Sequence, residues 1–206
     1  MSSAPTTNLA SQTVGGFLES LDAKVPTPGG GAAAAITGAT AAATAGMVVS
    51  YSINKKSLSE HSVFNTDAQK QLHRARTMFL MLADEDAAGY GVLNALWKLD
   101  KNDPKRVAGC ADAVSGAINP PRAMLALSVD LLRLCESLIT MTNRQLKSDL
   151  GVAAVLGNAS AKAAAWNVRI NIPLLPEGEQ AKANETVDMM LASANHLCAA
   201  IETECA

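Results

Sequence analysis

The chain has 206 residues, of which 49% are hydrophobic and 17% are charged, and this composition excludes an intrinsically disordered protein. The formal net charge is -2, so there is no basic surplus to bind a nucleic-acid backbone or an anionic membrane, and neither partner is expected. Aromatic residues make up only 3% and alanine dominates the apolar fraction, which favours closely packed helices over sheets.

The first predicted helix runs from about Thr13 to Ala23, with Thr13 as its N-cap. Residues 24–31, KVPTPGGG, predict a loop that is rigid at its prolines and flexible at its glycines. A second helix follows, from about Ala32 to Ser52. Residues 25–54 carry no charge and are numerous enough to span a bilayer, but they are mostly small residues that contribute little to insertion. We therefore expect a soluble helix that is buried on most sides.

The rest of the chain predicts five further helices, at about residues 62–99, 104–119, 122–143, 149–172 and 177–204. Asp103 is the expected cap of the second of these, with Pro104 at the first helical position. Pro120 and Pro121 are expected to separate that helix from the next. Because no stretch alternates with period two, we predict an all-α fold. We expect a single-domain bundle of about six to seven helices over residues 1–206.

Neither cysteines nor histidines indicate a metal site, because the four cysteines contain no CxxC pair and the three histidines lack ligand spacing. Buried free thiols are expected instead. The N-terminal sequence MSSAPTTNLA has no positive segment followed by an apolar one, so no signal peptide is expected. The predicted location is cytoplasmic.

The most unusual local feature is the run PTPGGG at residues 26–31. Three successive glycines before a helix expose backbone N–H groups, and the start of a helix favours an anion. The run is not a Walker A loop, because the sequence GK[ST] is absent. The alternative is a tight turn between two crowded helices, and spacing alone leaves both interpretations open.

Several other polar residues have both a structural and a functional interpretation. Lys55 and Lys56 suit the end of a helix, the acidic run 84–86 suits a solvated face, and Asp149 suits a first helical turn. Asn167 and Asn171 share a helix face at i, i+4 and are either core brackets or ligand contacts. The sequence has no apparent Ser-His-Asp or Cys-His constellation. Spacing therefore indicates a helical domain with a candidate anion-binding loop.

A set of motifs in one order is more specific. The set comprises VPTPGGGAAAA, the pair Lys55-Lys56, LADEDAAGYGVLNALWKLDK, the proline pair with Arg122, SDLGVAAVL and NVRINI. That order resembles the family of formiminotransferase-cyclodeaminase C-terminal domains over nearly the whole chain. The resemblance implies an all-helical subunit that dimerises through its helices and binds folate near the subunit interface.

Members of that family either hydrolyse 5,10-methenyltetrahydrofolate to 10-formyltetrahydrofolate or deaminate and cyclise 5-formiminotetrahydrofolate. Since no formiminotransferase domain is fused in this sequence, the resemblance favours the hydrolytic reaction here. The cyclodeaminase reaction, a non-catalytic folate-binding module and a purely structural oligomer remain as alternatives. The methenyl carbon is already electrophilic, so we expect no metal and no cofactor beyond the tetrahydrofolate substrate.

The resemblance also implies roles for individual residues. Asp149 and Asp86 are the candidate catalytic carboxylates, because burial can raise a carboxyl pKa into the working range, and their separate roles are left open. Lys56, or else Lys55, would orient water or shuttle a proton. Substrate contacts are expected from Pro28, Gly29, Gly30, Gly31, Lys55, Asn167, Arg169 and Asn171. Among these, Arg169 would hold a carboxylate of the glutamate tail, and the two asparagines would meet the pterin edge.

Overall fold

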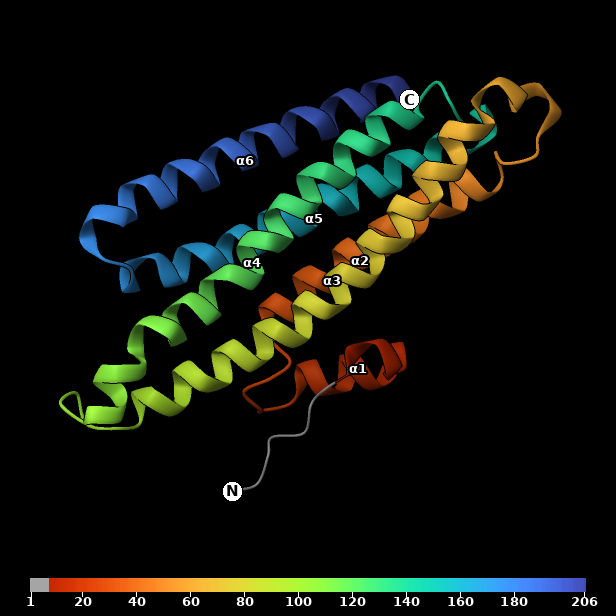
Figure 1. Cartoon of the computed structure of the whole chain (residues 1–206). Coiled ribbons are helices and arrows are strands. Elements are labelled where there is room, and N and C mark those ends of the chain that lie inside the picture. Colours follow the sequence, from red (N-terminus) through yellow and green to blue (C-terminus); the bar gives the residue numbers. More distant parts are fainter. Residues whose placement is uncertain (1–7) are drawn as a thin grey trace.

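The computed structural model describes residues 8–206, and within that range it is helical and contains no strand (Figure 1). Its six α-helices are α1 (Val14–Asp22), α2 (Gly30–Ser50), α3 (Ser62–Trp97), α4 (Pro104–Leu138), α5 (Lys147–Asn171) and α6 (Glu177–Cys205). The predicted all-α class is therefore confirmed, and the number of helices agrees with the expected six to seven.

The five long helices lie side by side in the bundle, and α1 is a short arm beside the start of α2 (Figure 1). α2 packs against α3 and α5, while α4 packs against α3 and α5 and also contacts α6. Small residues make this close packing possible on α2. At Gly38, for example, a Cβ atom would overlap the ring of Phe79 and come against the Ser160 hydroxyl. The alanine-rich helix thus lies in the main core.

Side chains at two helix starts have the expected capping geometry. The Thr13 hydroxyl accepts a 3.1 Å hydrogen bond from Gly16 N at the start of α1. At the start of α4, Asp103 Oδ1 accepts a 2.8 Å bond from Lys105 N, with Pro104 in the first turn. Both caps were predicted from the sequence and are confirmed.

The prediction that Pro120 and Pro121 end a helix is wrong, because α4 continues through both of them. A proline in a helix removes the N–H that would bond the carbonyl four residues earlier, which here belongs to Gly116 or Ala117. The Asn171 amide donates to Ala117 O at 3.3 Å and so replaces one lost bond. Both prolines are buried, so tertiary packing holds the helix together.

The outer ends of α3 and α4 form a tip with its own small core. Leu93 packs there with Ala113, Val114, Ala117 and Ile118, apart from the main cluster. This tip, residues 90–119, projects beyond the start of α2 in Figure 1.

A close helix contact lies at the base of the tip. A Cβ atom on Gly89 would overlap the carbonyl group of Gly116, so α3 and α4 approach through backbone alone at that level.

α2 is long and apolar enough to cross a membrane by length and composition. More than half of that stretch is buried inside the bundle, and core helices of soluble proteins meet the same criteria. The absence of a membrane partner therefore stays a prediction from the small-residue composition.

The cysteines are all free thiols. Cys135 and Cys198 are buried, as expected, and burial raises the pKa of the Cys135 thiol to about 12. Cys205 is half-buried, but Cys110 is exposed on the tip, so the expectation of burial is wrong for that residue.

Candidate active site

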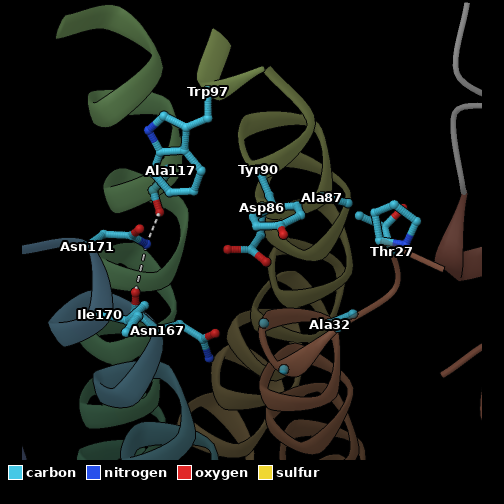
Figure 2. Close-up of a pocket in the computed structure, with 14 residues that line it drawn as sticks. Thr27, Ala32, Asp86, Ala87, Tyr90, Trp97, Ala117, Asn167, Ile170 and Asn171 are labelled. Atoms are coloured by element: carbon cyan, nitrogen blue, oxygen red, sulfur yellow. Dashed lines mark hydrogen bonds between the residues drawn. The ribbon is translucent and has the colours of Figure 1, made fainter. Parts of the chain in front are cut away.

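A cavity of about 340 Å³ opens where the loop before α2, the start of α2, the outer half of α3 and the end of α5 meet (Figure 2). Most of its wall is apolar, and a few polar groups converge on it, as is typical of small-molecule sites. Six of the residues predicted to form a site line this cavity: the candidate carboxylate Asp86 and the expected substrate contacts Gly29, Gly30, Gly31, Asn167 and Asn171.

The glycine run forms the start of α2 and presents backbone N–H groups there. Gly29 is the N-cap, and the first helical bond runs from Ala33 N to Gly29 O at 3.1 Å. The N–H groups of Gly30, Gly31 and Ala32 therefore have no partner within the helix. Gly31 is also a tight contact, because a Cβ atom there would overlap Asp86 Oδ2. The glycine run thus lets α2 approach Asp86 of α3 closely, and it presents backbone N–H groups that have no partner within the helix.

Asp86 lies on α3 with its carboxyl group facing the first turn of α2 and the cavity (Figure 2). Within the described residues, this carboxyl group forms neither a hydrogen bond nor an ion pair. Burial raises its pKa to about 6, because an apolar cavity disfavours the charged form. A carboxyl group with that pKa exchanges a proton readily near neutral pH.

Asn167 and Asn171 come from the last turns of α5, one helical turn apart. Asn167 Nδ2 donates to Ala163 O at 2.9 Å, and its Oδ1 lies beside Gly30 at the cavity wall. Asn171 Nδ2 donates to Asn167 O at 3.0 Å and to Ala117 O, as drawn in Figure 2. Asn171 therefore links α5 to α4 through a hydrogen bond, while Asn167 still offers its amide oxygen to a ligand.

Tyr90 and Trp97 also line the cavity, although neither was predicted from the sequence as a site residue. Both follow Asp86 on α3, at i+4 and i+11, so the three side chains share one face of the helix. That spacing was present in the sequence. It becomes informative only once Asp86 is known to face a cavity, because aromatic residues at helical spacing more often belong to a core.

Three other candidate residues lie at the opposite end of the bundle from this cavity. Lys55 and Lys56 follow the C-terminal end of α2, and Asp149 lies in the first turn of α5. The 21 residues of α2 separate the lysines from the glycine run by about 30 Å. Within a single subunit, Asp149, Lys55 and Lys56 are therefore far from Asp86.

The polar groups at that opposite end bond mostly to one another. Lys55 Nζ donates to Asn143 Oδ1 at 2.7 Å, and Asn143 N donates to the Ser52 hydroxyl at 2.9 Å. Asn65 Nδ2 donates to Met141 O at 2.8 Å. Lys56 is exposed and Asp149 is half-buried. The first two bonds tie the end of α2, and the third ties the start of α3, to the loop between α4 and α5.

Pro28 and Arg169 also lie outside the cavity wall. Pro28 is buried behind the glycine run and follows a cis peptide bond with Thr27. Arg169 Nη2 forms an ion pair with Asp188 Oδ1 at 2.5 Å, which links α5 to α6. The substrate contacts predicted for these two residues stay predictions, and the structure gives each of them a packing or pairing role.

A metal site was not expected, and residues 8–206 contain no cluster of three or more His, Cys, Asp or Glu side chains suited to one. Independence of metal ions stays a prediction about activity.

Comparison with curated proteins gives two kinds of relative. The chain is 33% identical to a methenyltetrahydrofolate cyclohydrolase of Methylorubrum extorquens over 167 residues, which cover 78% of this chain and 79% of that protein. It is 26% identical to formimidoyltransferase-cyclodeaminases of Gallus gallus and Mus musculus, over 80% and 82% of its own length. These matches cover only 31% and 32% of those longer proteins.

Among solved structures, the fold is similar to a crystal structure described as formiminotetrahydrofolate cyclodeaminase from Thermotoga maritima. The TM-score is 0.85 at 23% sequence identity, and the match covers 95% of this chain and 96% of that one. At this identity the likeness establishes the fold alone. The model of the formiminotransferase-cyclodeaminase family matches residues 13–188, nearly the whole bundle and all cavity residues. The chain therefore belongs to the formiminotransferase-cyclodeaminase family.

Proposed function

We propose that the chain is a methenyltetrahydrofolate cyclohydrolase, which hydrolyses 5,10-methenyltetrahydrofolate to 10-formyltetrahydrofolate. The observation that carries the proposal is Asp86, a carboxyl group in a mainly apolar cavity that has no partner among residues 8–206 and has a pKa of about 6. Family membership and the 33% identical cyclohydrolase support this choice of reaction.

The substrate chemistry matches this carboxyl group. The carbon that bridges N5 and N10 is part of an amidinium cation, which an ionised Asp86 attracts electrostatically. At neutral pH most of the Asp86 population is ionised, because its pKa is about 6. The N–H groups at the start of α2 suit a neutral carbonyl oxygen or ring nitrogen of the same substrate.

The proposed reaction starts when Asp86 takes one proton from a water molecule while the oxygen of that water attacks the bridging carbon. The resulting tetrahedral intermediate then breaks its bond between carbon and N5, and Asp86 returns the proton to N5. The second proton of the water leaves to solvent as the formyl C=O forms on N10. Overall, one water is consumed and one proton is released.

We also propose a homodimer, because α2 and α5 each leave a strip of mainly apolar side chains exposed. On α2 and at its C-cap the exposed residues include Ala43, Met47 and Tyr51, and no residue from 30 to 50 is charged. The α5 strip includes Val152, Val155, Trp166 and Ile170, with 46–75% of each side chain exposed, and Lys162 is the charged residue on that face. Exposed apolar patches mark interaction surfaces.

A two-fold axis perpendicular to α2 and α5 would bring the two ends of the bundle together between copies. Ile170 belongs both to the α5 strip and to the cavity wall, so a partner seated on the strip borders the cavity. In that arrangement Asp149 and Lys56 of one copy would complete the site around Asp86 of the other. The cytoplasmic location stays a prediction from the sequence.

The decay of the ultraviolet absorbance of methenyltetrahydrofolate, with and without protein, tests the proposed reaction. Decay faster than the spontaneous hydrolysis supports it, whereas binding without faster decay would indicate a folate-binding module. Formiminotetrahydrofolate is the second substrate to assay, and release of ammonia from it would favour the cyclodeaminase alternative.

Mixing inactive variants tests whether a site is shared between copies. Asp86→Asn and Asp149→Asn proteins, dissociated and reassembled together, should recover about a quarter of wild-type activity, because half of the dimers contain one intact site out of two. No recovery, with both variants still dimeric by light scattering, would mean that Asp149 does not act in the partner's site. A monomer at micromolar concentration would contradict the dimer itself.

A further inference from the structure

The two ends of the active-site cavity differ in polarity. At the α2 end, the free N–H groups of the glycine run and Asn167 Oδ1 face the space. At the tip end, the wall consists of Trp97, Ala117 and Asn171, whose amide nitrogen already bonds Ala117 O and Asn167 O. Figure 2 shows Asp86 between these ends, with Trp97 on one side and Asn167 and Ala32 on the other.

Distances along α3 support this arrangement. Trp97 lies 11 residues, or about 16 Å of helix axis, beyond Asp86 towards the tip. Its ring leans back towards Asp86, because helical side chains point to the N-terminus of their helix. Trp97 remains 44% exposed, so the tip end offers an indole surface that a ligand could cover.

A reduced folate with a methenyl bridge also has two different halves. The reacting carbon lies between a bicyclic pterin, whose far edge carries amino, N–H and carbonyl groups, and a p-aminobenzoyl ring, whose faces are apolar. When that carbon lies at Asp86, one half must extend towards Asn167 and the other towards Trp97. The reverse placement would put most of the polar pterin edge against the indole and the helix N–H groups against an aryl ring, so fewer polar groups would find partners.

We propose that Trp97 is a substrate-binding residue that stacks on the p-aminobenzoyl ring, and that the pterin edge binds Asn167 and the N–H groups at the start of α2. This inference rests on the proposed function and goes beyond it, because it fixes the direction of the substrate in the cavity. It also gives the tip a role, since the small core around Leu93 and Ile118 supports the last turns of α3 that hold Trp97.

Calorimetric titration with two ligands tests this orientation without relying on turnover. Tetrahydrofolate contains both halves, whereas 6-methyltetrahydropterin lacks the p-aminobenzoyl arm. In Trp97→Leu the affinity for tetrahydrofolate should fall about 5- to 50-fold, as expected for loss of a stacking partner, while the affinity for the pterin changes less than about twofold. Asn167→Leu should weaken the binding of both ligands.

Two variants serve as controls. Met81→Ala removes an exposed apolar side chain elsewhere on the same helix, outside the cavity wall, and should leave both affinities unchanged. Trp97→Phe should retain most of the tetrahydrofolate affinity, because a phenyl ring still stacks. The melting temperature of each variant separates a loss of binding from a loss of folding.

The outcomes that overturn the inference differ from those that overturn the proposed function. Equal weakening of both ligands in Trp97→Leu, or no weakening of either, would reject the orientation while leaving the reaction intact. Wild-type protein that binds neither ligand would reject the folate function and the orientation with it.

Discussion

The two ends of α2 contrast in how their polar side chains are paired. At the C-terminal end, Lys55, Asn143 and Ser52 bond to one another and hold two loops together. At the N-terminal end, the Asp86 carboxyl group faces an apolar cavity without a protein partner in the described part of the chain, beside free N–H groups. Buried polar groups are normally paired, so an unpaired and half-buried carboxylate indicates a group retained for a ligand or for chemistry.

Stability and function are therefore concentrated at different ends of this bundle. The paired end can be expected to lose stability when it is altered, because each substitution leaves a polar partner without its bond. At the cavity end, removal of the Asp86 charge should lower activity and raise stability, because burying that charge is itself unfavourable. Four predictions test this contrast.

The largest effect is expected for Asp86→Asn. An amide fills the same space but cannot take up and return a proton near neutral pH, so kcat should fall by about 10²–10⁴. The variant should also be about 1–3 kcal/mol more stable than wild type at pH 8, since the buried charge is gone. Assays of turnover and urea denaturation at pH 8 measure both effects. A variant with normal turnover would transfer the catalytic role away from Asp86.

A smaller loss is expected for Gly31→Ala, in which the new Cβ would overlap Asp86 Oδ2 and displace the carboxyl group. We expect kcat to fall about 10- to 100-fold, because displacement by about 1 Å misplaces the reacting group. Gly29→Ala is the matched control, since a Cβ there meets no atom within 4 Å. Similar kinetics for both variants would show that the contact between Gly31 and Asp86 is not needed for turnover.

The pH dependence follows from the raised pKa of Asp86. Below about pH 6 the carboxyl group is mostly protonated and cannot act as a base. As the pH decreases further, kcat should therefore fall, approaching a tenfold loss per pH unit. The folded protein binds this proton more tightly than the unfolded protein does. Protonation of Asp86 therefore adds to the free energy of unfolding at low pH, and this contribution is lost as the pH rises to about 6. In Asp86→Asn, the fitted pKa near 6 should disappear from the plot of stability against pH. Its persistence there would assign that titration to another group.

The smallest effect is expected at the paired end. Lys55→Met removes the donor to Asn143 Oδ1, and the free energy of unfolding should fall by about 1–2 kcal/mol. Lys56→Met, at an exposed neighbour, should change stability by less than about 0.5 kcal/mol. Chemical denaturation measures both variants. Equal stabilities would mean that the Lys55 bond does not hold the loops together.

Much of the helical pattern followed from local sequence alone. Thr13 and Asp103 fix two helix starts through short-range capping bonds, and the prediction for each was confirmed. The failure at Pro120 and Pro121 has a long-range cause. Asn171, 50 or more residues away, supplies a hydrogen bond to Ala117 O, and burial holds both prolines in place. No local rule contains that compensation.

The sequence by itself determined the all-helical class, most helix boundaries and the candidate polar residues, because capping, helical periodicity and composition act within a few turns of the chain. Tertiary structure decided which candidates meet. Asp86 and Asp149 were equivalent in the sequence, but only Asp86 lies beside the glycine run, and Trp97 gained a role only through the cavity that it lines. Burial raises the Asp86 pKa, and within residues 8–206 the carboxyl group has no partner. Both features arise only when helices distant in sequence pack around it.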